Sequence, residues 1–256
     1  MRLTVLGSGT AVPRAERGSP AHLVELGEGE RVLLDLGPGG CRQLARLGVR
    51  PRAIRRVLIS HHHPDHTLDL VHLLFAANYP GELRTEPLMV LGPPGFRAFF
   101  AALCAPYGQA LRASAYELVI DELHPGARRR FEGWMLQCAP TRHTEHSLAF
   151  RLTELGPGGR ARALVYSGDG GYGRELVELA RGADLLLMEC SFPDGQGVPG
   201  HATPAVAARI AREAGVGRMV LVHLYPPCDE VDLLAQVRAG WDGPVELARD
   251  LARYEV

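Results

Sequence analysis

Residues 61–66 read His61-His62-His63-Pro64-Asp65-His66, directly after an apolar run at 57–60 that predicts a buried strand. In an extended loop, residues two apart point the same way, so His61 and His63 can hold one ion together. Asp65 and His66 can then face a second ion, whereas His62 is expected to point away from the metals and either to pack or to contact a ligand from outside. Imidazoles with one carboxylate favour Zn²⁺ or a similar borderline metal over Mg²⁺ or Ca²⁺. This run therefore predicts a metal site at the end of a strand.

Further metal donors stand at other predicted strand ends. Asp169 opens a glycine-rich turn after one apolar segment, His223 ends another, and His143 lies just before a third. Because an α/β fold gathers functional side chains at its strand ends, we expect these donors to complete the metal shells. His146 is as competent a ligand as His143, and the residues alone leave that choice open.

Alternating apolar runs and turn residues predict a layered α/β protein. Strands are expected at 2–6, 21–26, 31–36, 55–60, 87–91, 116–120, 131–139, 147–153, 162–167, 184–189 and 218–222. Helices are expected at 39–47, 65–77, 94–104, 174–181, 204–214 and 229–240.

The ordered set His61-x-His63-x-Asp65-His66, His143, Asp169 and His223 resembles the metallo-β-lactamase superfamily. Within it the chain looks most like the ribonuclease Z branch, through the segments 6–13, 34–39, 92–96 and 201–203. The resemblance covers nearly the whole chain. It implies an α/β fold, the metallo-β-lactamase-type αββα four-layer sandwich, in one domain spanning residues 1–256.

The resemblance also implies how two Zn²⁺ ions would be held, with Mn²⁺ or Fe as alternative metals. The first ion would take His61, His63 and His143, the second Asp65, His66 and His223, with Asp169 bridging. His143 is preferred to His146 because the family places a serine four residues after this ligand, where Ser147 stands.

Two residues are expected to take part directly in the reaction. Two metals about 3.5–4 Å apart can clamp the attacking and leaving oxygens, and bound zinc lowers the pKa of water to about 7. A metal-bound hydroxide would then be the nucleophile, oriented by Asp65. His201 is expected to protonate the leaving group or to steady the developing oxyanion. The glutamate that the family often places beside this histidine is absent, since Ala202 stands there, so the sequence identifies no partner for His201.

The substrate class follows from what the chain does not contain. Ribonuclease Z enzymes normally insert a tRNA-gripping arm between the motifs of His143 and Asp169, which here lie 26 positions apart (169 − 143). That leaves residues 155–159 as a tight hairpin turn. A net charge of −1 and a pI near 6.8 give no basic field for nucleic acid. We therefore expect a phosphodiesterase acting on a small-molecule or nucleotide phosphodiester, with Arg14, Arg17 and Arg142 available for phosphate.

Three other functions stay open. The chain resembles ribonuclease Z enough to suggest a tRNA 3′-processing endonuclease, although nucleic acid is the less favoured partner. The same metal core also serves carboxylic ester, lactone or thioester hydrolysis. A metal-binding protein without turnover is the non-enzyme alternative, but such members generally lose ligands, and this chain keeps all seven.

Composition places the chain among ordinary globular enzymes. It has 256 residues, with 46% hydrophobic and 22% charged. The five cysteines are scattered and lack C-x-x-C spacing, which is typical of reduced thiols in a cytoplasmic protein. Met1 leads directly into a predicted strand, so we expect no signal peptide, and no apolar run approaches the ~20 residues of a membrane span. A homodimer is expected from the resemblance alone.

Overall fold

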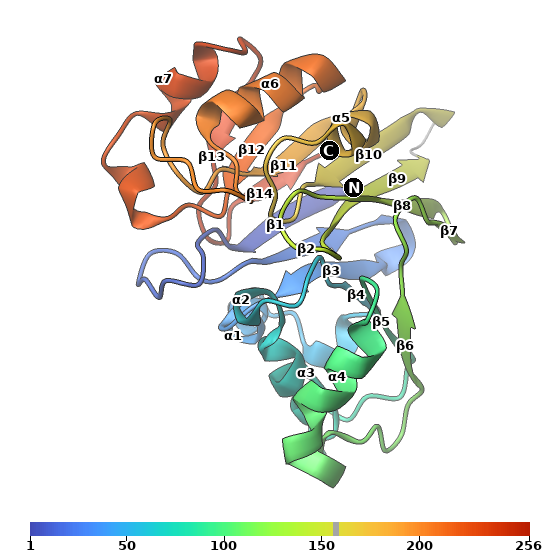
Figure 1. Ribbon diagram of the computed structural model, residues 1–256. Helices are drawn as coiled ribbons and strands as arrows, with labels where there is room; N and C mark the ends of the chain where they lie inside the picture. Colours follow the sequence, from blue (N-terminus) through green and yellow to red (C-terminus); the bar gives the residue numbers. More distant parts are fainter. Residues whose placement is uncertain (156–158) are drawn as a thin grey trace. The chain divides into compact units, whose positions relative to one another are not determined.

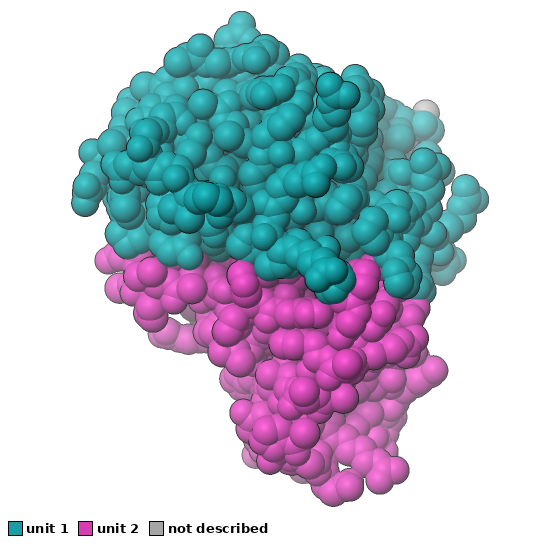
Figure 2. Space-filling view, in the orientation of Figure 1, with its two compact units in different colours: residues 1, 124–248, 255–256 teal, residues 2–123, 249–254 magenta. Residues whose placement is uncertain are grey.

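The structure, a computed structural model, describes residues 1–155 and 159–256. The chain divides into two compact units, coloured in Figure 2. Unit 1 comprises Met1, His124–Ala248 and Glu255–Val256, and unit 2 comprises Arg2–Leu123 and Arg249–Tyr254. The predicted organisation as one domain over 1–256 stays a prediction. The predicted hairpin turn at 155–159 falls largely outside the described residues.

Unit 2 is built on a seven-stranded mixed sheet. Its strands, in spatial order, are β14 (Arg253–Glu255), β1 (Arg2–Gly7), β2 (Ala21–Glu25), β3 (Arg31–Leu36), β4 (Arg56–Leu58), β5 (Leu88–Gly92) and β6 (Leu118–Glu122). The pairs β1–β2 and β2–β3 are antiparallel, and β3 to β6 run parallel. The helices of this unit are α1 (Gly40–Arg46), α2 (Pro64–Thr67), α3 (Asp69–Ala77) and α4 (Phe96–Cys104). Because β3, β4 and β5 run parallel, the loops leaving them emerge at one edge of the sheet.

Unit 1 carries a second seven-stranded sheet. Its order is β13 (Val245–Leu247), β12 (Met219–Val222), β11 (Leu185–Glu189), β10 (Ala161–Tyr166), β9 (Leu148–Leu155), β8 (Trp134–Pro140) and β7 (Arg128–Phe131). Strands β10 to β13 are parallel, and β7 to β10 are antiparallel. The helices are α5 (Arg174–Ala180), α6 (Pro204–Ala214) and α7 (Leu233–Arg238).

The core of unit 1 explains why the parallel strands read as continuous apolar runs. Every residue of β11 and β12 is buried. Helices α5, α6 and α7 pack on this sheet and share one apolar cluster with it (Figure 1). Helix α6 begins at Pro204, where a missing N–H costs nothing, and ends at Gly215 in the left-handed conformation. A sheet covered in this way exposes its functional side chains only at strand ends.

Most predicted elements are present, with differences that have local causes. The helix predicted over 65–77 is divided at Leu68 into α2 and α3. The helix predicted over 229–240 begins only at Leu233, because the Asp232 side chain caps it by accepting a hydrogen bond from the Ala235 N–H. Three short strands, β7, β13 and β14, were not predicted. No helix within the described ranges is both long and apolar enough to cross a membrane.

Candidate metal centre

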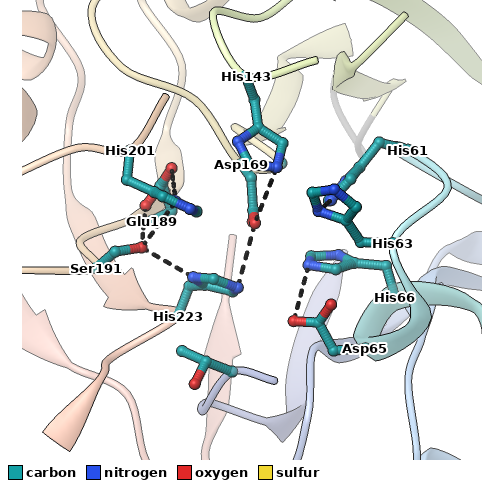
Figure 3. A network of polar contacts seen from close by, with 12 residues as sticks. His61, His63, Asp65, His66, His143, Asp169, Glu189, Ser191, His201 and His223 are labelled. Carbon is teal, nitrogen blue, oxygen red and sulfur yellow. Dashed lines mark hydrogen bonds and ion pairs between the residues drawn. The ribbon is translucent and has the colours of Figure 1, made fainter. Parts of the chain in front are cut away.

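The histidine-rich loop of unit 2 follows β4 and turns into α2. Figure 3 shows His61, His63 and His66 of this segment. Nε2 of His61 lies 3.0 Å from Nδ1 of His63, so these two side chains converge as their spacing predicted. Nε2 of His66 lies 3.6 Å from an Asp65 carboxylate oxygen. His61, Asp65 and His66 are buried, whereas His63 is exposed. The four donors of unit 2 thus form two adjacent pairs.

His62 takes a different direction from its neighbours. Its ring stacks on Phe99 with centroids 4.6 Å apart and an interplanar angle of 3°. Because Phe99 belongs to α4, the His62 ring packs against that helix, which is one of the two roles predicted from the sequence.

Asp35, near the end of β3, holds this loop in place through hydrogen bonds. Its carboxylate accepts hydrogen bonds from the Ser60 N–H, the Ser60 hydroxyl and Nδ1 of His66, each at 2.7 Å. Asp35 is fully buried and has φ 56°, a strained conformation for a residue with a side chain. Such strain persists where surrounding contacts over-determine it, and here three hydrogen bonds do so.

A glycine lets the two loops of unit 2 touch. A Cβ on Gly37, directly after β3, would lie only 1.7 Å from the backbone oxygen of Asp65. No side chain fits there, so the chain after Asp35 can press against the start of α2 only with glycine at this position.

The donors of unit 1 come from three strand ends. Nε2 of His223 lies 3.2 Å, and Nε2 of His143 3.9 Å, from the same Asp169 carboxylate oxygen (Figure 3). Asp169 and His223 follow the parallel strands β10 and β12, which end at one edge of the sheet. The Thr141 hydroxyl donates to the Asp169 backbone oxygen at 2.6 Å and joins the end of β8 to that edge.

His146, the alternative to His143, lies elsewhere. Its ring is exposed, and its Nε2 lies 3.9 Å from a Glu145 carboxylate oxygen. The Ser147 hydroxyl accepts a hydrogen bond from the Thr144 N–H at 3.1 Å and closes the turn that follows His143. This contact gives a physical reason for a serine four residues after the donor, because it shapes the loop that carries it.

The hydrogen bonds of four histidines define which ring nitrogen each presents. His66 donates from Nδ1 to the Asp35 carboxylate, and His143 donates from Nδ1 to the Gly200 carbonyl at 2.9 Å, since both partners only accept. Nδ1 of His61 lies 2.9 Å from the Ser60 hydroxyl, whose own proton goes to Asp35. These rings therefore carry the proton on Nδ1 and present the Nε2 lone pair.

His223 follows the same rule. Its Nδ1 lies 2.9 Å from the Ser191 hydroxyl, and that hydroxyl donates its proton to Glu189. His223 also has φ 58°, so its backbone is strained like that of Asp35. A histidine fixed by an outer partner on Nδ1 with Nε2 turned inward is the arrangement that zinc-binding histidines show in proteins. The residues present therefore fit a bound divalent metal.

Glu189 and Ser191 are functional candidates that the sequence analysis missed. Glu189 ends the apolar strand β11, is fully buried, and accepts from the Gly170 N–H at 2.5 Å. Nδ1 of His201 lies 3.3 Å from the Glu189 carboxylate and 3.2 Å from the Ser191 hydroxyl. The available signal was a glutamate closing an otherwise apolar run, since such a buried charge needs partners.

His201 itself lies close to the donors of unit 1. One donor atom each from His143, Asp169 and His201 lie within 4.8 Å of one another, so His201 is also near enough to serve as a metal ligand. Its outer contact to a carboxylate is compatible with either role.

Comparison with known proteins shows the family of this chain. The model of the Beta-lactamase superfamily domain matches residues 30–224. The chain belongs to the metallo-β-lactamase superfamily. Its fold class is therefore confirmed, and the superfamily is one of hydrolases.

Relatives in this superfamily include proteins named ribonuclease Z. The ribonuclease Z of Methanosarcina acetivorans is 29% identical, covering 100% of this chain and 98% of that protein. The structure of the short form of human tRNase Z has a TM-score of 0.81 and 27% identity, covering 100% of this chain and 99% of that chain. A metallo-β-lactamase fold protein of Bacillus subtilis has a TM-score of 0.80 at 24% identity, covering 99% of each chain, and shows the fold alone. The predicted resemblance to the ribonuclease Z branch is confirmed.

Proposed function

We propose that this metallo-β-lactamase superfamily member is a metal-dependent phosphodiesterase. Its ligands would be His61, His63, Asp65, His66, His143, Asp169 and His223, holding two Zn²⁺ ions, with Mn²⁺ or Fe as alternatives. The grouping of donors from both units in one binuclear metal centre rests on the family pattern. The observation that carries the proposal is the set of outer hydrogen bonds that turn Nε2 inward on four of these histidines.

The chain's own residues divide the remaining work of hydrolysis. When bound, the metals supply an activated water and stabilise developing negative charge. The Asp65 carboxylate orients the attacking water by accepting a hydrogen bond from it. His201 delivers a proton from Nε2 to the departing oxygen, because its Nδ1 already faces the Glu189 carboxylate. Glu189 acts as a positioning residue that keeps the proton on Nδ1 and steadies the imidazolium.

The names of the relatives support phosphodiesters as the substrate class. The relatives are named ribonuclease Z, and a ribonuclease cleaves phosphodiester bonds, which supports this bond over a carboxylic ester. The alignment with the Methanosarcina protein spans 305 positions, 49 more than this chain has residues (305 − 256). A shorter chain with net charge −1 supports a small or nucleotide phosphodiester over tRNA.

Processing of the 3′ end of tRNA is the second candidate, favoured by full-length similarity to those relatives. Ester, lactone or thioester hydrolysis and metal binding without turnover are the remaining alternatives. A cytoplasmic location and a homodimer belong to the proposal as well.

The test is hydrolysis by the zinc-loaded protein of bis(p-nitrophenyl) phosphate beside p-nitrophenyl acetate and a tRNA precursor. Asp65→Ala serves as the blank, and Asp242→Ala, at an exposed aspartate, as the matched control. We expect diester cleavage that Asp65→Ala abolishes and Asp242→Ala retains. Metal-dependent cleavage of the carboxylic ester alone, or no turnover of any substrate, would overturn the proposal. Cleavage of the precursor in preference to the diester would favour the tRNA enzyme.

A further inference from the structure

A pocket of about 330 Å³ lies in unit 2, and of its lining residues only Asp65 has a part in the mechanism above. Its walls include Arg14, Arg17, Pro38, Pro64, Asp65 and Leu68. Because Asp65 is one of them, the pocket opens beside the histidine-rich loop. A group bound there would lie next to the proposed reaction site.

Residues 9–18 form the outer wall of this pocket and are called the arginine loop. The loop is closed at its base, where the Gly9 N–H donates to the Gly18 carbonyl at 2.8 Å. Glycine is required at this closure, since a Cβ on Gly9 would lie 2.9 Å from both Cβ and the carbonyl oxygen of Arg17. The base of the arginine loop is therefore fixed by a backbone hydrogen bond and by the need for glycine at position 9.

Asp250 anchors the base of the arginine loop. Its carboxylate accepts from the N–H groups of Ser8 and Gly18, at 2.9 and 2.8 Å, and from the Gln43 side chain at 3.0 Å. Its negative charge is thus spread over several neutral donors below the loop. Arg17 is oriented by the Ser8 hydroxyl, which accepts from its Nη1 at 3.0 Å.

Two arginines and one acidic residue are among the residues that line the pocket. Arg14 and Arg17 are the arginines, and among the described residues that line it, Asp65 alone has a carboxylate. Asp65 is itself a proposed metal ligand, so its charge would be offset when metal is bound. Guanidinium groups bind phosphate through paired hydrogen bonds that an ammonium cannot reproduce. Arg142, the third arginine predicted to be available, pairs with Glu175 at 2.9 Å.

The size and remaining walls of the pocket limit its ligand. A volume of about 330 Å³ lies at the lower end of the roughly 300–1,000 Å³ typical of small-molecule sites. Pro38, Pro64 and Leu68 provide apolar surface beside the two arginines. A compact, strongly anionic group such as a phosphate monoester fits this surface.

We propose that this pocket binds a second phosphate of the substrate, one that is not cleaved. The substrate class is then a nucleotide-sized phosphodiester with an additional phosphate monoester. This inference rests on the proposed phosphodiesterase function and adds the residues that select its substrate.

The test compares two substrates that differ only in that phosphate: thymidine 5′-(p-nitrophenyl phosphate) with and without a 3′-phosphate. We expect the 3′-phosphate to raise kcat/KM at least about tenfold. Arg14→Gln/Arg17→Gln should bring the ratio close to one, and Arg14→Lys/Arg17→Lys should keep part of it. The matched control, Arg42→Gln/Arg52→Gln, removes two exposed arginines of the same unit and should keep the full ratio. An equal ratio in wild type and in the Gln variant would refute the pocket's role.

A binding measurement separates this inference from the proposed function. Calorimetry would compare thymidine 3′,5′-bisphosphate with thymidine 5′-monophosphate, with no turnover required. Tighter binding of the bisphosphate, by at least about tenfold and lost only in the Gln variant, would support the pocket even for a protein that cleaves neither ester. Equal binding of both nucleotides would overturn it, whatever the phosphodiesterase activity.

Discussion

The Glu189 carboxylate lies 3.3 Å from Nδ1 of His201, which gives that histidine the acidic partner that the sequence did not identify. Glu189 ends a buried strand, and His201 precedes α6. The Ser191 hydroxyl donates to Glu189 and lies 2.9 Å from Nδ1 of His223. The proposed proton donor and a proposed metal ligand therefore share one hydrogen-bond network.

The first prediction concerns this pair. Replacing Glu189 with Gln should lower kcat by about 10²-fold and change KM little. The neutral amide of Gln would not stabilise the imidazolium of His201 as the Glu189 carboxylate does. His201→Ala should lower kcat by about 10²–10⁴-fold. The double variant should be no slower than His201→Ala alone, since both changes remove the same proton transfer. The measurement is steady-state diester hydrolysis at fixed zinc.

A matched control for this prediction lies on α5 of the same unit. Glu178→Gln alters an exposed glutamate that pairs with Arg181 and should retain wild-type kcat. Multiplicative losses in the double variant would show that Glu189 and His201 act independently.

The second prediction is that Asp35→Asn weakens zinc binding by about 10–100-fold. Asn tolerates the positive φ at this position, so the fold should persist, but the amide no longer provides the carboxylate that holds the Nδ1 proton of His66. Competition with a chromophoric chelator would measure the affinity. Asp121→Asn, at the Asp121–Arg97 surface pair, is the control and should bind zinc normally. Unchanged affinity in Asp35→Asn would show that the outer contact is not needed.

The third prediction distinguishes two neighbouring histidines by metal content. The zinc-loaded protein should hold two ions per chain, and His143→Ala should hold fewer, because its Nε2 faces Asp169. His146→Ala should retain both ions, since that ring is exposed beside Glu145. Metal analysis after dialysis would measure the stoichiometry. Loss of metal in His146→Ala but not in His143→Ala would reverse the proposed assignment.

The fourth prediction concerns Gly37. Gly37→Ala should cost about 1–3 kcal/mol of unfolding free energy, because its Cβ would lie 1.7 Å from the Asp65 backbone oxygen and one loop must move. Gly81→Ala is the control, with its nearest atoms at an ordinary 3.7 Å. Urea denaturation would compare both variants with wild type. Equal stability of the two variants would show that the loop yields at no cost.

The fifth prediction is a loss of stability at high pH. Burial raises the pKa of the thiols of Cys41, Cys104, Cys138 and Cys190 above the ordinary value of 9.0. These thiols ionise near pH 9 in the unfolded chain and only at higher pH in the folded one. Ionisation of these thiols therefore leaves the free energy of unfolding unchanged below pH 9. It lowers that free energy as the pH rises from 9 through the raised pKa values of the folded state.

Denaturation at pH 8 and pH 10 would measure this loss. The drop in unfolding free energy should be smaller in Cys190→Ala than in wild type, because one ionising thiol is removed. A drop of the same size in both proteins would assign the effect to other groups.

Much of the fold was predictable because its signals are local. Apolar runs of strand length, such as β3, β11 and β12, are buried on both faces and are recognised without knowledge of their partners. The short strands β13 and β14 were not predicted, because three residues at a sheet edge carry too little pattern. Their strand character comes from pairing with a neighbour.

The proposed donors were also readable from the chain, since each is a metal-binding side chain close to the end of an apolar run. His61 and His63 converge because backbone geometry alone turns residues two apart to one side.

The partners behind those donors were decided only by tertiary structure. Asp35 reaches His66 across 31 positions because β3 and β4 pair in parallel and end at the same edge. Glu189 and Ser191 reach His201 and His223 because β11 lies next to β12. Residue types and local spacing therefore determined what chemistry this protein can carry. The alignment of neighbouring strands decided which nitrogen each histidine presents, because a proton is fixed by an acceptor that only the folded sheet supplies.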